Sequence, residues 1–371
     1  MKIIFVSNYL NHHQSYFCDQ LSKMVDSFFF IATNNNYTQG YQSHINSSYV
    51  LDFDFYKKEC LALIEEADVC IFGGCPTELI EFRMKTSKTT LLYTERFFKR
   101  GSWRRLIPRT YKEIHRRTIR FKNKKFYILC AGAYVSDDLT KLNFPKEKCF
   151  KWGYFPKLIL YNDMKELFLK KDPLLLIWCG RLLNWKHPEI ALKIASALKK
   201  RGYLFKLKIV GEGPMFFDIQ RKIKKYNLED SVSLIGSLST NSVRELMENA
   251  GICLVTSDKQ EGWGVVLNEA MNSGCVVVAN KAIGSAPYLI KDKSNGFLYK
   301  GNRTSEIIKI IEPLFRNTNL QKEVGKKAYY TIKEEWNYVT ACSRLMDFLT
   351  FLADDTNDEY KNAASGPMSK V

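Results

Sequence analysis

Residues 261–274 read Glu-Gly-Trp-Gly-Val-Val-Leu-Asn-Glu-Ala-Met-Asn-Ser-Gly, and the interpretation of the whole chain starts from this stretch. The apolar runs on either side, residues 252–255 and 275–278, are typical of buried parallel strands. Residues 265–273 are expected to form a short helix, because Gly274 stands where a glycine commonly ends one. The pattern of strand, loop, helix and strand places the loop at the carboxyl end of a strand, where open α/β sheets bind ligands.

Two carboxylates flank this loop. Glu261 is expected to stay in the loop, and Glu269 to lie about one turn inside the helix. The free N–H groups at a helix start suit a phosphate, and glycines let the backbone approach a ligand closely. The expected phosphate contacts are the backbone groups of Gly262, Gly264, Val265 and Val266. This arrangement fits a sugar–diphosphate–ribose ligand, with the sugar at Glu261 and the ribose at Glu269. A glutamate pair at this spacing on a lone helix would instead usually be a solvated face.

The motif Glu-x7-Glu followed by Ala-Met-x-x-Gly, from Glu261 to Gly274, resembles the signature of retaining GT-B glycosyltransferases of family 4, also called glycosyl transferases group 1. The resemblance covers residues 174–297 well and the rest by architecture. It implies an α/β fold of the GT-B type, with two Rossmann-like domains facing across a cleft and a C-terminal helix that crosses back to the first domain. It also implies that Glu261 contacts the donor sugar and Glu269 the nucleotide ribose.

Other loops of the second half fit the same resemblance. Arg181 and Lys186 follow an expected strand; an arginine can bind a phosphate in a bidentate manner, and a lysine adds a point charge. The resemblance implies that this pair neutralises the leaving diphosphate. Gly211, in a Gly-Glu-Gly-Pro loop, and Gly236 with Leu238 resemble the loops on the nucleotide side.

The first half alternates expected strands and helices, which implies a parallel sheet. His12 and His13 follow the first strand, where they could bind donor or acceptor or simply cap a helix. This first loop lacks the Gly-Gly pair of many family members. Glu95 follows a later strand and is expected to act as an acid, a base or an orienting group; the alternative is a surface ion pair of little energetic weight.

The chain has 371 residues, more than one core usually organises. Four segments are expected: an acceptor-binding domain (1–155), a sugar-nucleotide-binding domain (156–335), a crossover helix (336–353) and a disordered tail (354–371).

A formal net charge of +17 predicts an anionic partner. Residues 96–125 carry thirteen lysines and arginines and one acid, Glu113, so this segment contributes 13 − 1 = +12. Aromatic residues are interleaved, which favours a surface that lies on anionic lipid. The residues expected to face the membrane are Arg104, Arg105, Arg116 and Arg117. A solvated helix is the alternative; a nucleic-acid groove is disfavoured, because no recognised nucleic-acid-binding motif is present.

No metal and no cofactor are expected. The ten cysteines form no Cys-x-x-Cys pair, and no Asp-x-Asp motif stands in a suitable place. The first residues lack the pattern of a signal peptide, and no apolar run has the length of a membrane span. A cytoplasmic protein bound peripherally to the inner face of the plasma membrane is expected, with cysteines reduced in its core.

The expected activity is transfer of a hexose with retention, from a nucleotide sugar (a UDP-sugar first) to a lipid-linked or polysaccharide acceptor of a surface glycan. The resemblance implies a same-face mechanism in which the leaving phosphate helps to deprotonate the acceptor. Two alternatives remain open: an enzyme of another class on the same fold, such as a sugar-nucleotide epimerase or a glycogen-type phosphorylase with pyridoxal phosphate, and a basic lipid- or nucleic-acid-binding module without catalysis.

Overall fold

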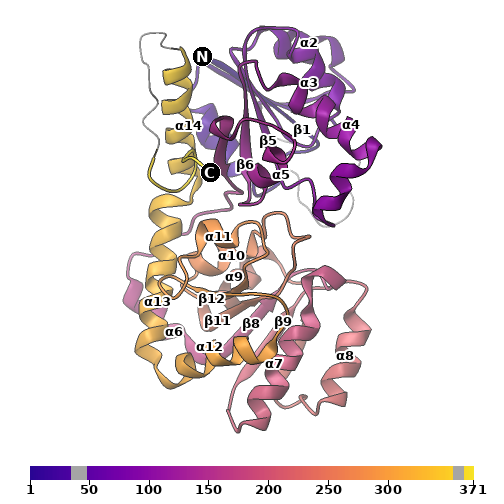
Figure 1. The fold of residues 1–371 in the computed structure, drawn as a ribbon. Helices are drawn as coiled ribbons and strands as arrows, with labels where there is room; N and C mark the ends of the chain where they lie inside the picture. The colour runs from indigo at the N-terminus through magenta and orange to yellow at the C-terminus, as the bar shows by residue number, and fades with distance from the viewer. Residues whose placement is uncertain (35–47, 354–362) are drawn as a thin grey trace. The chain divides into compact units, whose positions relative to one another are not determined.

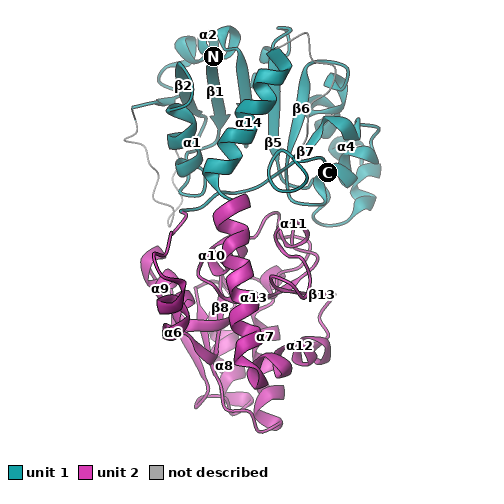
Figure 2. Ribbon diagram, turned by 90° about the vertical axis from the view of Figure 1, so that its left-hand side faces the viewer, with its two compact units in different colours: residues 1–157, 336–371 teal, residues 158–335 magenta. Residues whose placement is uncertain are grey.

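The computed structural model describes residues 1–34, 48–353 and 363–371 and divides the chain into two compact units. Unit 1 comprises residues 1–157 and 336–371, and unit 2 comprises residues 158–335 (Figure 2). The divisions therefore fall at 157/158 and 335/336, against 155/156 and 335/336 expected from the sequence. Because residues 336–371 return to unit 1, the first unit is built from both ends of the chain.

Unit 1 contains a seven-stranded parallel sheet in the order β3-β2-β1-β4-β5-β6-β7. The strands are β1 (Lys2–Ser7), β2 (Ser27–Ala32), β3 (Val50–Asp52), β4 (Val69–Phe72), β5 (Thr89–Thr94), β6 (Phe126–Ala131) and β7 (Cys149–Trp152). The central strands are continuous apolar runs because helices cover both faces of such a sheet. The strand order reverses between β1 and β4, and the carboxyl ends of these two strands mark the place where such sheets bind ligands.

Helices of unit 1 surround this sheet (Figure 1). They are α1 (Ser15–Ser22), α2 (Lys57–Glu66), α3 (Thr77–Arg83), α4 (Pro108–Arg117), α5 (Val135–Thr140) and α14 (Tyr338–Ala353), with the 3-10 turns η1 (Ser102–Leu106), η2 (Ile119–Phe121) and η3 (Lys146–Lys148). The long α14 lies beside α1: the rings of Tyr16 and Tyr338 stack with centroids 5.8 Å apart, and Cys342 Sγ is 3.4 Å from the carbonyl oxygen of Phe17. The last helix therefore completes the core of the first unit.

The end of the chain is packed against β7. The sequence predicts disorder over 354–371; residues 354–362 lie outside the described residues, and for 363–371 the prediction is wrong. Met368 and Ser369 are buried, and Lys151 exchanges two backbone hydrogen bonds of 2.8 Å with them. The physical reason is that β7 is an edge strand with unpaired backbone groups, which the returning chain covers.

Unit 2 contains a six-stranded parallel sheet in the order β10-β9-β8-β11-β12-β13. Its strands are β8 (Asp172–Cys179), β9 (Lys206–Val210), β10 (Val232–Gly236), β11 (Ala250–Val255), β12 (Val276–Asn280) and β13 (Phe297–Tyr299). Every residue of β11 and β12 is buried, as their uninterrupted apolar runs predict. Here the strand order reverses between β8 and β11.

The helices of unit 2 are α6 (Met164–Lys170), α7 (Pro188–Lys200), α8 (Phe216–Lys225), α9 (Thr240–Asn249), α10 (Val266–Asn272), α11 (Ala286–Leu289), α12 (Thr304–Arg316) and α13 (Thr318–Tyr330), with the 3-10 turn η4 (Asn184–Lys186) and the π-helical turn η5 (Thr331–Glu335). The strand–loop–helix–strand prediction around residues 252–278 is confirmed by β11, α10 and β12. Apolar residues at helical spacing on α7, among them Ile190, Ile194 and Leu198, join the core beside the sheet.

One local sequence signal in unit 2 is overridden by contacts with distant residues. Asn295-Gly296 is the usual signal of a two-residue hairpin, but β13 pairs in parallel with β12, so no hairpin forms. The Asn295 side chain instead holds the loop: it accepts from the backbone N–H of Lys291 (2.7 Å) and donates to the carbonyl of Leu289 (2.9 Å) and to Thr331 (2.8 Å). A partner on η5, distant in sequence, fixes this asparagine in a role that no local pattern reveals.

Candidate functional site

Two oppositely charged side chains meet at the point in unit 2 where the strand order reverses. Lys186 lies in the loop after β8, and Glu261 in the loop after β11. Lys186 Nζ is 2.5 Å from Glu261 Oε2, and the side chains are only 16% and 17% exposed. Ser257 Oγ donates to the same carboxylate oxygen at 3.1 Å. The structure therefore brings together two residues predicted to act on a donor, and shows that they are paired.

A buried hydroxyl holds the Lys186 loop in place. Thr256 follows β11 directly; its Oγ1 accepts from Trp178 Nε1 (2.7 Å) and donates to the backbone carbonyl of Lys186 (2.6 Å). The backbone N–H of Asp258 donates to the carbonyl of Trp185 (2.8 Å). Sequence analysis missed these polar residues. The available signal was a hydroxyl-bearing pair, Thr256 and Ser257, directly after a buried strand.

The conformation of the Glu261 loop depends on Gly264. Its φ is +86°, and a Cβ there would lie 2.8 Å from Ile283 Cγ2 and 3.2 Å from Glu261 Cγ. The helix α10 that follows has seven residues. Among the described residues, the N–H groups of Val265 and Val266 have no acceptor. These donors are the backbone groups that the sequence assigns to a phosphate.

Glu269 is a carboxylate available for a ligand. It is half-buried on α10, and within the described part of the chain its side chain makes neither a hydrogen bond nor an ion pair. Burial raises the pKa of this carboxyl, and the nearby Arg244 lowers it. Arg244 donates to the backbone carbonyl of Glu269 (2.9 Å) rather than to the carboxylate. An acceptor held ready in this way can bind hydroxyl groups.

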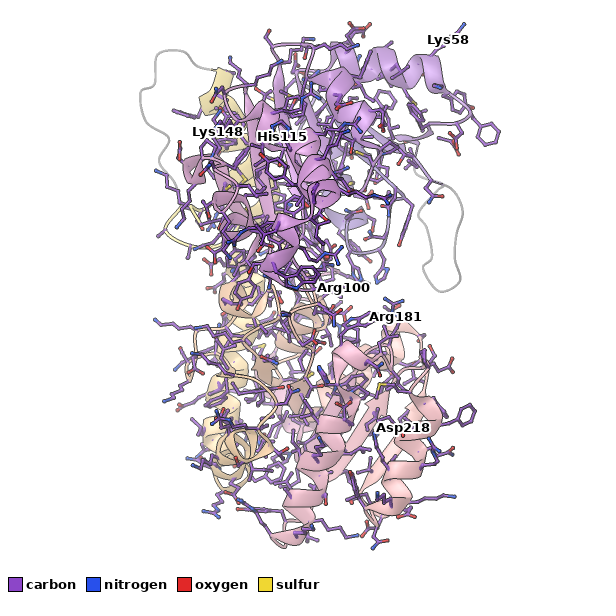
Figure 3. All side chains as sticks on the ribbon, turned by 45° about the vertical axis from the view of Figure 1, so that its right-hand side comes forward. Lys58, Arg100, His115, Lys148, Arg181 and Asp218 are labelled. Carbon is purple, nitrogen blue, oxygen red and sulfur yellow. The ribbon has the colours of Figure 1, made fainter. Side chains whose placement is uncertain are left out.

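Arg181 differs from Lys186 in having no partner. It is exposed, and none of the described residues forms an ion pair or hydrogen bond with its guanidinium group. Figure 3 shows it on the outside of unit 2, above Asp218 of α8. The two cations predicted to bind a diphosphate are thus an arginine without a partner in the described part of the chain and a lysine already paired with Glu261.

Packing explains the glycine at position 211. Its φ is +132°, and a Cβ there would lie 2.0 Å from the carbonyl oxygen of Gly180. Gly211 also donates from its N–H to the carbonyl of Gly236 (2.7 Å), so the loops after β8, β9 and β10 are joined. Gly236 has φ +83°, and Leu238 beyond it is 37% exposed. The nucleotide-binding role of these residues stays a prediction; what the structure shows at Gly211 is the need for close contact between two loops.

In unit 1, three side chains gather at the carboxyl ends of β1, β5 and β7. The ring of His13 lies 6.1 Å from that of Tyr154, whose hydroxyl donates to Glu95 Oε1 at 2.8 Å. Lys99 Nζ lies 2.5 Å from the other oxygen of Glu95. His13 Nδ1 is buried with no partner among the described residues; burial and the neighbouring His12 lower the pKa of His13 to about 3. His13 is therefore neutral at physiological pH, and Tyr154, a residue that sequence analysis missed, lies between it and Glu95.

A glycine pair does approach the first loop, but it comes from a later strand. Gly73 and Gly74 follow β4, the neighbour of β1 across the reversal of strand order. Gly74 N–H donates to Ser7 Oγ at 3.2 Å, and a Cβ at Gly73 would lie 2.6 Å from that oxygen. Gly73 and Gly74 therefore allow the loop after β4 to pack closely against the end of β1.

The basic segment divides into paired and unpaired cations. Arg116 binds Glu81 (2.8 Å) and Glu78 (3.2 Å), and Arg117 donates to the carbonyls of Gly73 and Cys75. Both arginines therefore have partners within unit 1, and the expectation that they face a membrane stays a prediction. Arg104 and Arg105 form no ion pair with any residue that the structure describes.

Comparison with known proteins agrees with this geometry. Residues 161–331 match the family model described as glycosyl transferases group 1. Unit 2 is a glycosyl transferases group 1 domain. An uncharacterised glycosyltransferase of Haemophilus influenzae is 30% identical over 164 residues, which are 44% of this chain and 46% of that protein. The poly(ribitol-phosphate) alpha-N-acetylglucosaminyltransferase of Staphylococcus aureus is 29% identical over 226 residues, 58% of this chain and 44% of that protein. The chain thus spans less than half the length of these curated relatives.

The fold extends beyond the glycosyl transferases group 1 domain. The crystal structure of HepE from Anabaena in complex with UDP covers 95% of this chain and 100% of its own, with a TM-score of 0.74 and 14% identity. The two Rossmann-like units therefore have the GT-B fold. None of the described helices is both long and apolar enough to span a bilayer, and the described histidine, cysteine and acidic residues form no cluster suited to a metal.

Proposed function

We propose that this protein is a retaining glycosyltransferase that moves a hexose from a nucleotide sugar to a glycan or lipid-linked glycan acceptor in the synthesis of a surface polysaccharide. The observation that carries the proposal is the Lys186–Glu261 ion pair at the strand-order reversal of unit 2, together with the carboxylate of Glu269, which has no partner among the described residues. Parallel α/β sheets bind ligands at this place. The group 1 family match of the same residues supports the proposal.

Each residue has a chemical task in this proposal. The departing nucleoside diphosphate gains negative charge in the transition state, and preorganised cations stabilise that charge. Arg181 and Lys186 supply the cations, and the N–H groups of Val265 and Val266 supply donors without a charge. Glu261 orients the sugar hydroxyls, and Glu269 accepts hydrogen bonds from the ribose.

We propose UDP as the nucleotide, because the structural relative from Anabaena binds UDP. The acceptor class is proposed from the Staphylococcus relative, whose name describes transfer to poly(ribitol-phosphate). A same-face mechanism needs from the protein only the diphosphate-binding cations and a carboxylate that orients the sugar. We propose that these side chains take the place of a metal ion and that no cofactor is needed.

The test measures nucleotide binding and turnover with matched variants. UDP at a hundred times its dissociation constant should stabilise the protein by about 2.7 kcal/mol in thermal denaturation, with GDP and ADP giving smaller shifts. Slow hydrolysis of UDP-sugars should disappear in Lys186→Ala and Glu261→Ala. Lys199→Ala is the control, because Lys199 forms an ion pair of similar length with Asp230 (2.8 Å) on the surface of unit 2. Hydrolysis that survives both site variants would refute the assignment.

We further propose that the protein lies on the cytoplasmic face of the plasma membrane through η1 and α4. Trp103, Leu106 and Tyr111 are 60%, 75% and 44% exposed on this segment, which lies on the outside of unit 1 (Figure 1). Arg104 and Arg105 stand among them, and each such cation contributes about 1 kcal/mol near an anionic bilayer.

Liposome flotation tests this surface. Trp103→Ser with Leu106→Ser, and separately Arg104→Glu with Arg105→Glu, should reduce binding to phosphatidylglycerol vesicles. Lys57→Glu with Lys58→Glu, on exposed positions of α2, is the matched charge reversal and should change binding much less. Equal binding of all three variants would refute the proposed face.

A further inference from the structure

His187 has an unusual backbone conformation next to the candidate site. It follows η4 directly and has φ 51° and ψ 51°, in the left-handed region, before Pro188 opens α7. Residues other than glycine are uncommon in this region, because the conformation destabilises the fold by about 1 kcal/mol or more. Such a conformation persists only where surrounding contacts stabilise it. The contacts of its ring show what holds it.

The imidazole of His187 lies between two carboxylates. Its Nδ1 is 3.0 Å from Glu189 Oε1, and its Nε2 is 3.3 Å from Asp258 Oδ2. An ionised carboxylate only accepts hydrogen bonds, so both ring nitrogens must donate, and only the imidazolium carries two N–H groups. The geometry therefore suits protonated His187, because a neutral ring would face one of the carboxylates with a lone pair.

Asp258 organises the turn that carries Glu261. Its other carboxylate oxygen accepts from the N–H of Gln260 (2.8 Å), and its carbonyl accepts from the N–H of Glu261 (3.1 Å). His187 in turn is the residue directly after Lys186. The His187–Asp258 contact thus joins the two loops within three residues of each partner in the Lys186–Glu261 ion pair.

We propose that His187 is a positioning residue whose imidazolium holds the Lys186 loop against the Glu261 turn, so that affinity for a nucleoside diphosphate depends on its protonation. The choice of ligand rests on the proposed function, whereas the joining of the two loops does not. The hydroxyl of Thr256 donates to the carbonyls of Lys186 and His187 and does not titrate, so its contacts with the same loops do not depend on pH. The contact that changes with protonation is the one made by His187.

The sign of the pH effect follows from the groups around the ring. Glu189 of α7 and Asp258 face it directly, Lys222 of α8 acts on Glu189, and Lys186 with Glu261 lies beside it as a neutral pair. The hydrogen bond with Glu189 raises the pKa of His187 above its usual 6.5, with smaller contributions from Asp258, while burial opposes the shift. A raised histidine pKa stabilises the joined loops fully below pH 6.5, and this stabilisation is lost as pH rises through the folded-state pKa.

The test compares the wild type with His187→Gly from pH 6.5 to 9, by calorimetric titration with UDP. Glycine accepts the left-handed conformation, so this variant removes the ring without straining the backbone. His115→Ala is the control, because His115 lies on α4 of unit 1 and stacks on Tyr111 (Figure 3). We expect wild-type affinity to fall about tenfold across this range, and His187→Gly to be about tenfold weaker at pH 6.5 and to depend much less on pH.

Asp258→Asn should reproduce part of the loss, because an amide oxygen is a weaker acceptor for the imidazolium. A His187→Gly protein that binds UDP as tightly as the wild type, or that keeps the wild-type pH dependence, overturns the proposal. If the wild type binds no UDP, that result contradicts the proposed function but does not test the role of His187. Hydrogen exchange of the ligand-free proteins then tests whether His187 holds the two loops together. Faster exchange across residues 183–190 and 257–262 in His187→Gly, but not in His115→Ala, supports the proposal, and unchanged exchange overturns it.

Discussion

The Lys186–Glu261 ion pair predicts opposite effects of two substitutions on UDP binding. Each charge of the pair compensates the other beside the place where the diphosphate is proposed to bind. Lys186→Met leaves one uncompensated negative charge there, and Glu261→Gln leaves one uncompensated positive charge. Lys186→Met should therefore weaken UDP binding, and Glu261→Gln should strengthen it, although turnover of a UDP-sugar is lost in both.

The size of the effect follows from the geometry. At 2.5 Å and an effective dielectric constant of about 20, the Coulomb attraction is about 7 kcal/mol. Desolvation of two groups that are only about one-sixth exposed offsets much of this, and hydrogen bonds to charged groups contribute a net 1.5–3 kcal/mol, roughly. We therefore expect a coupling energy of about 2 kcal/mol in unfolding, and changes in UDP affinity of about tenfold in each direction.

The assay is a double-mutant cycle, measured by urea unfolding and by calorimetric titration with UDP. The double variant restores a net charge of zero at the site, so its UDP affinity should return close to that of the wild type. Lys199→Met with Asp230→Asn provides the matched cycle for an exposed pair, where coupling should stay below about 1 kcal/mol. If Glu261→Gln weakens UDP binding as much as Lys186→Met does, or if the unfolding free energies are additive within about 0.5 kcal/mol, the assigned roles are wrong.

Three further predictions concern stability. Gly211→Ala should lower the free energy of urea unfolding by about 3 kcal/mol, because its Cβ would lie 2.0 Å from a carbonyl oxygen. Gly202→Ala, at a position with φ +78° and open space around it, should lower it by about 1 kcal/mol. Equal losses of stability would contradict the packing role of Gly211. Met368→Ala should cost about 2 kcal/mol, because the side chain is fully buried, and an unchanged urea midpoint would mean that the chain end does not pack. Burial raises the pKa of Glu269, so ionisation of this residue destabilises the fold as pH rises above about 4.3. Glu269→Gln should therefore have a higher melting temperature than the wild type at pH 7, but not at pH 4, and should bind UDP more weakly. A lower melting temperature of the variant at pH 7 would refute the raised pKa.

Local patterns predicted the elements around the candidate site correctly. The strand β11 and the helix α10 follow from an uninterrupted apolar run, a glycine-containing loop and a terminal glycine, all of which act within a few residues. The choice of Glu261, Glu269, Arg181 and Lys186 came from loop positions after strands and from a family resemblance. In a parallel sheet every such loop reaches the same edge, so positions after strands are informative even without coordinates.

The sequence did not reveal partners that are distant along the chain. Arg116 and Arg117 are predicted to face a membrane, and the structure adds that residues 73–81 supply acceptors for both of them. Asn295 reads as a turn residue, but its amide bonds Thr331 on a later turn. The chain end reads as disordered because it is polar, and it packs because the edge strand β7 has backbone groups to pair.

The amino-acid sequence alone therefore indicated the class of fold, the elements around residues 252–278 and the residue types at the strand ends of unit 2, because apolar periodicity and glycine positions act locally. Tertiary structure alone decided how those residues are used. Lys186 pairs with Glu261, Arg181 and Glu269 have no partner among the described residues, and His187 bridges Glu189 and Asp258. The physical reason is that charge pairing and protonation depend on distances of a few ångströms between loops about 70 residues apart, which only the folded sheet brings together.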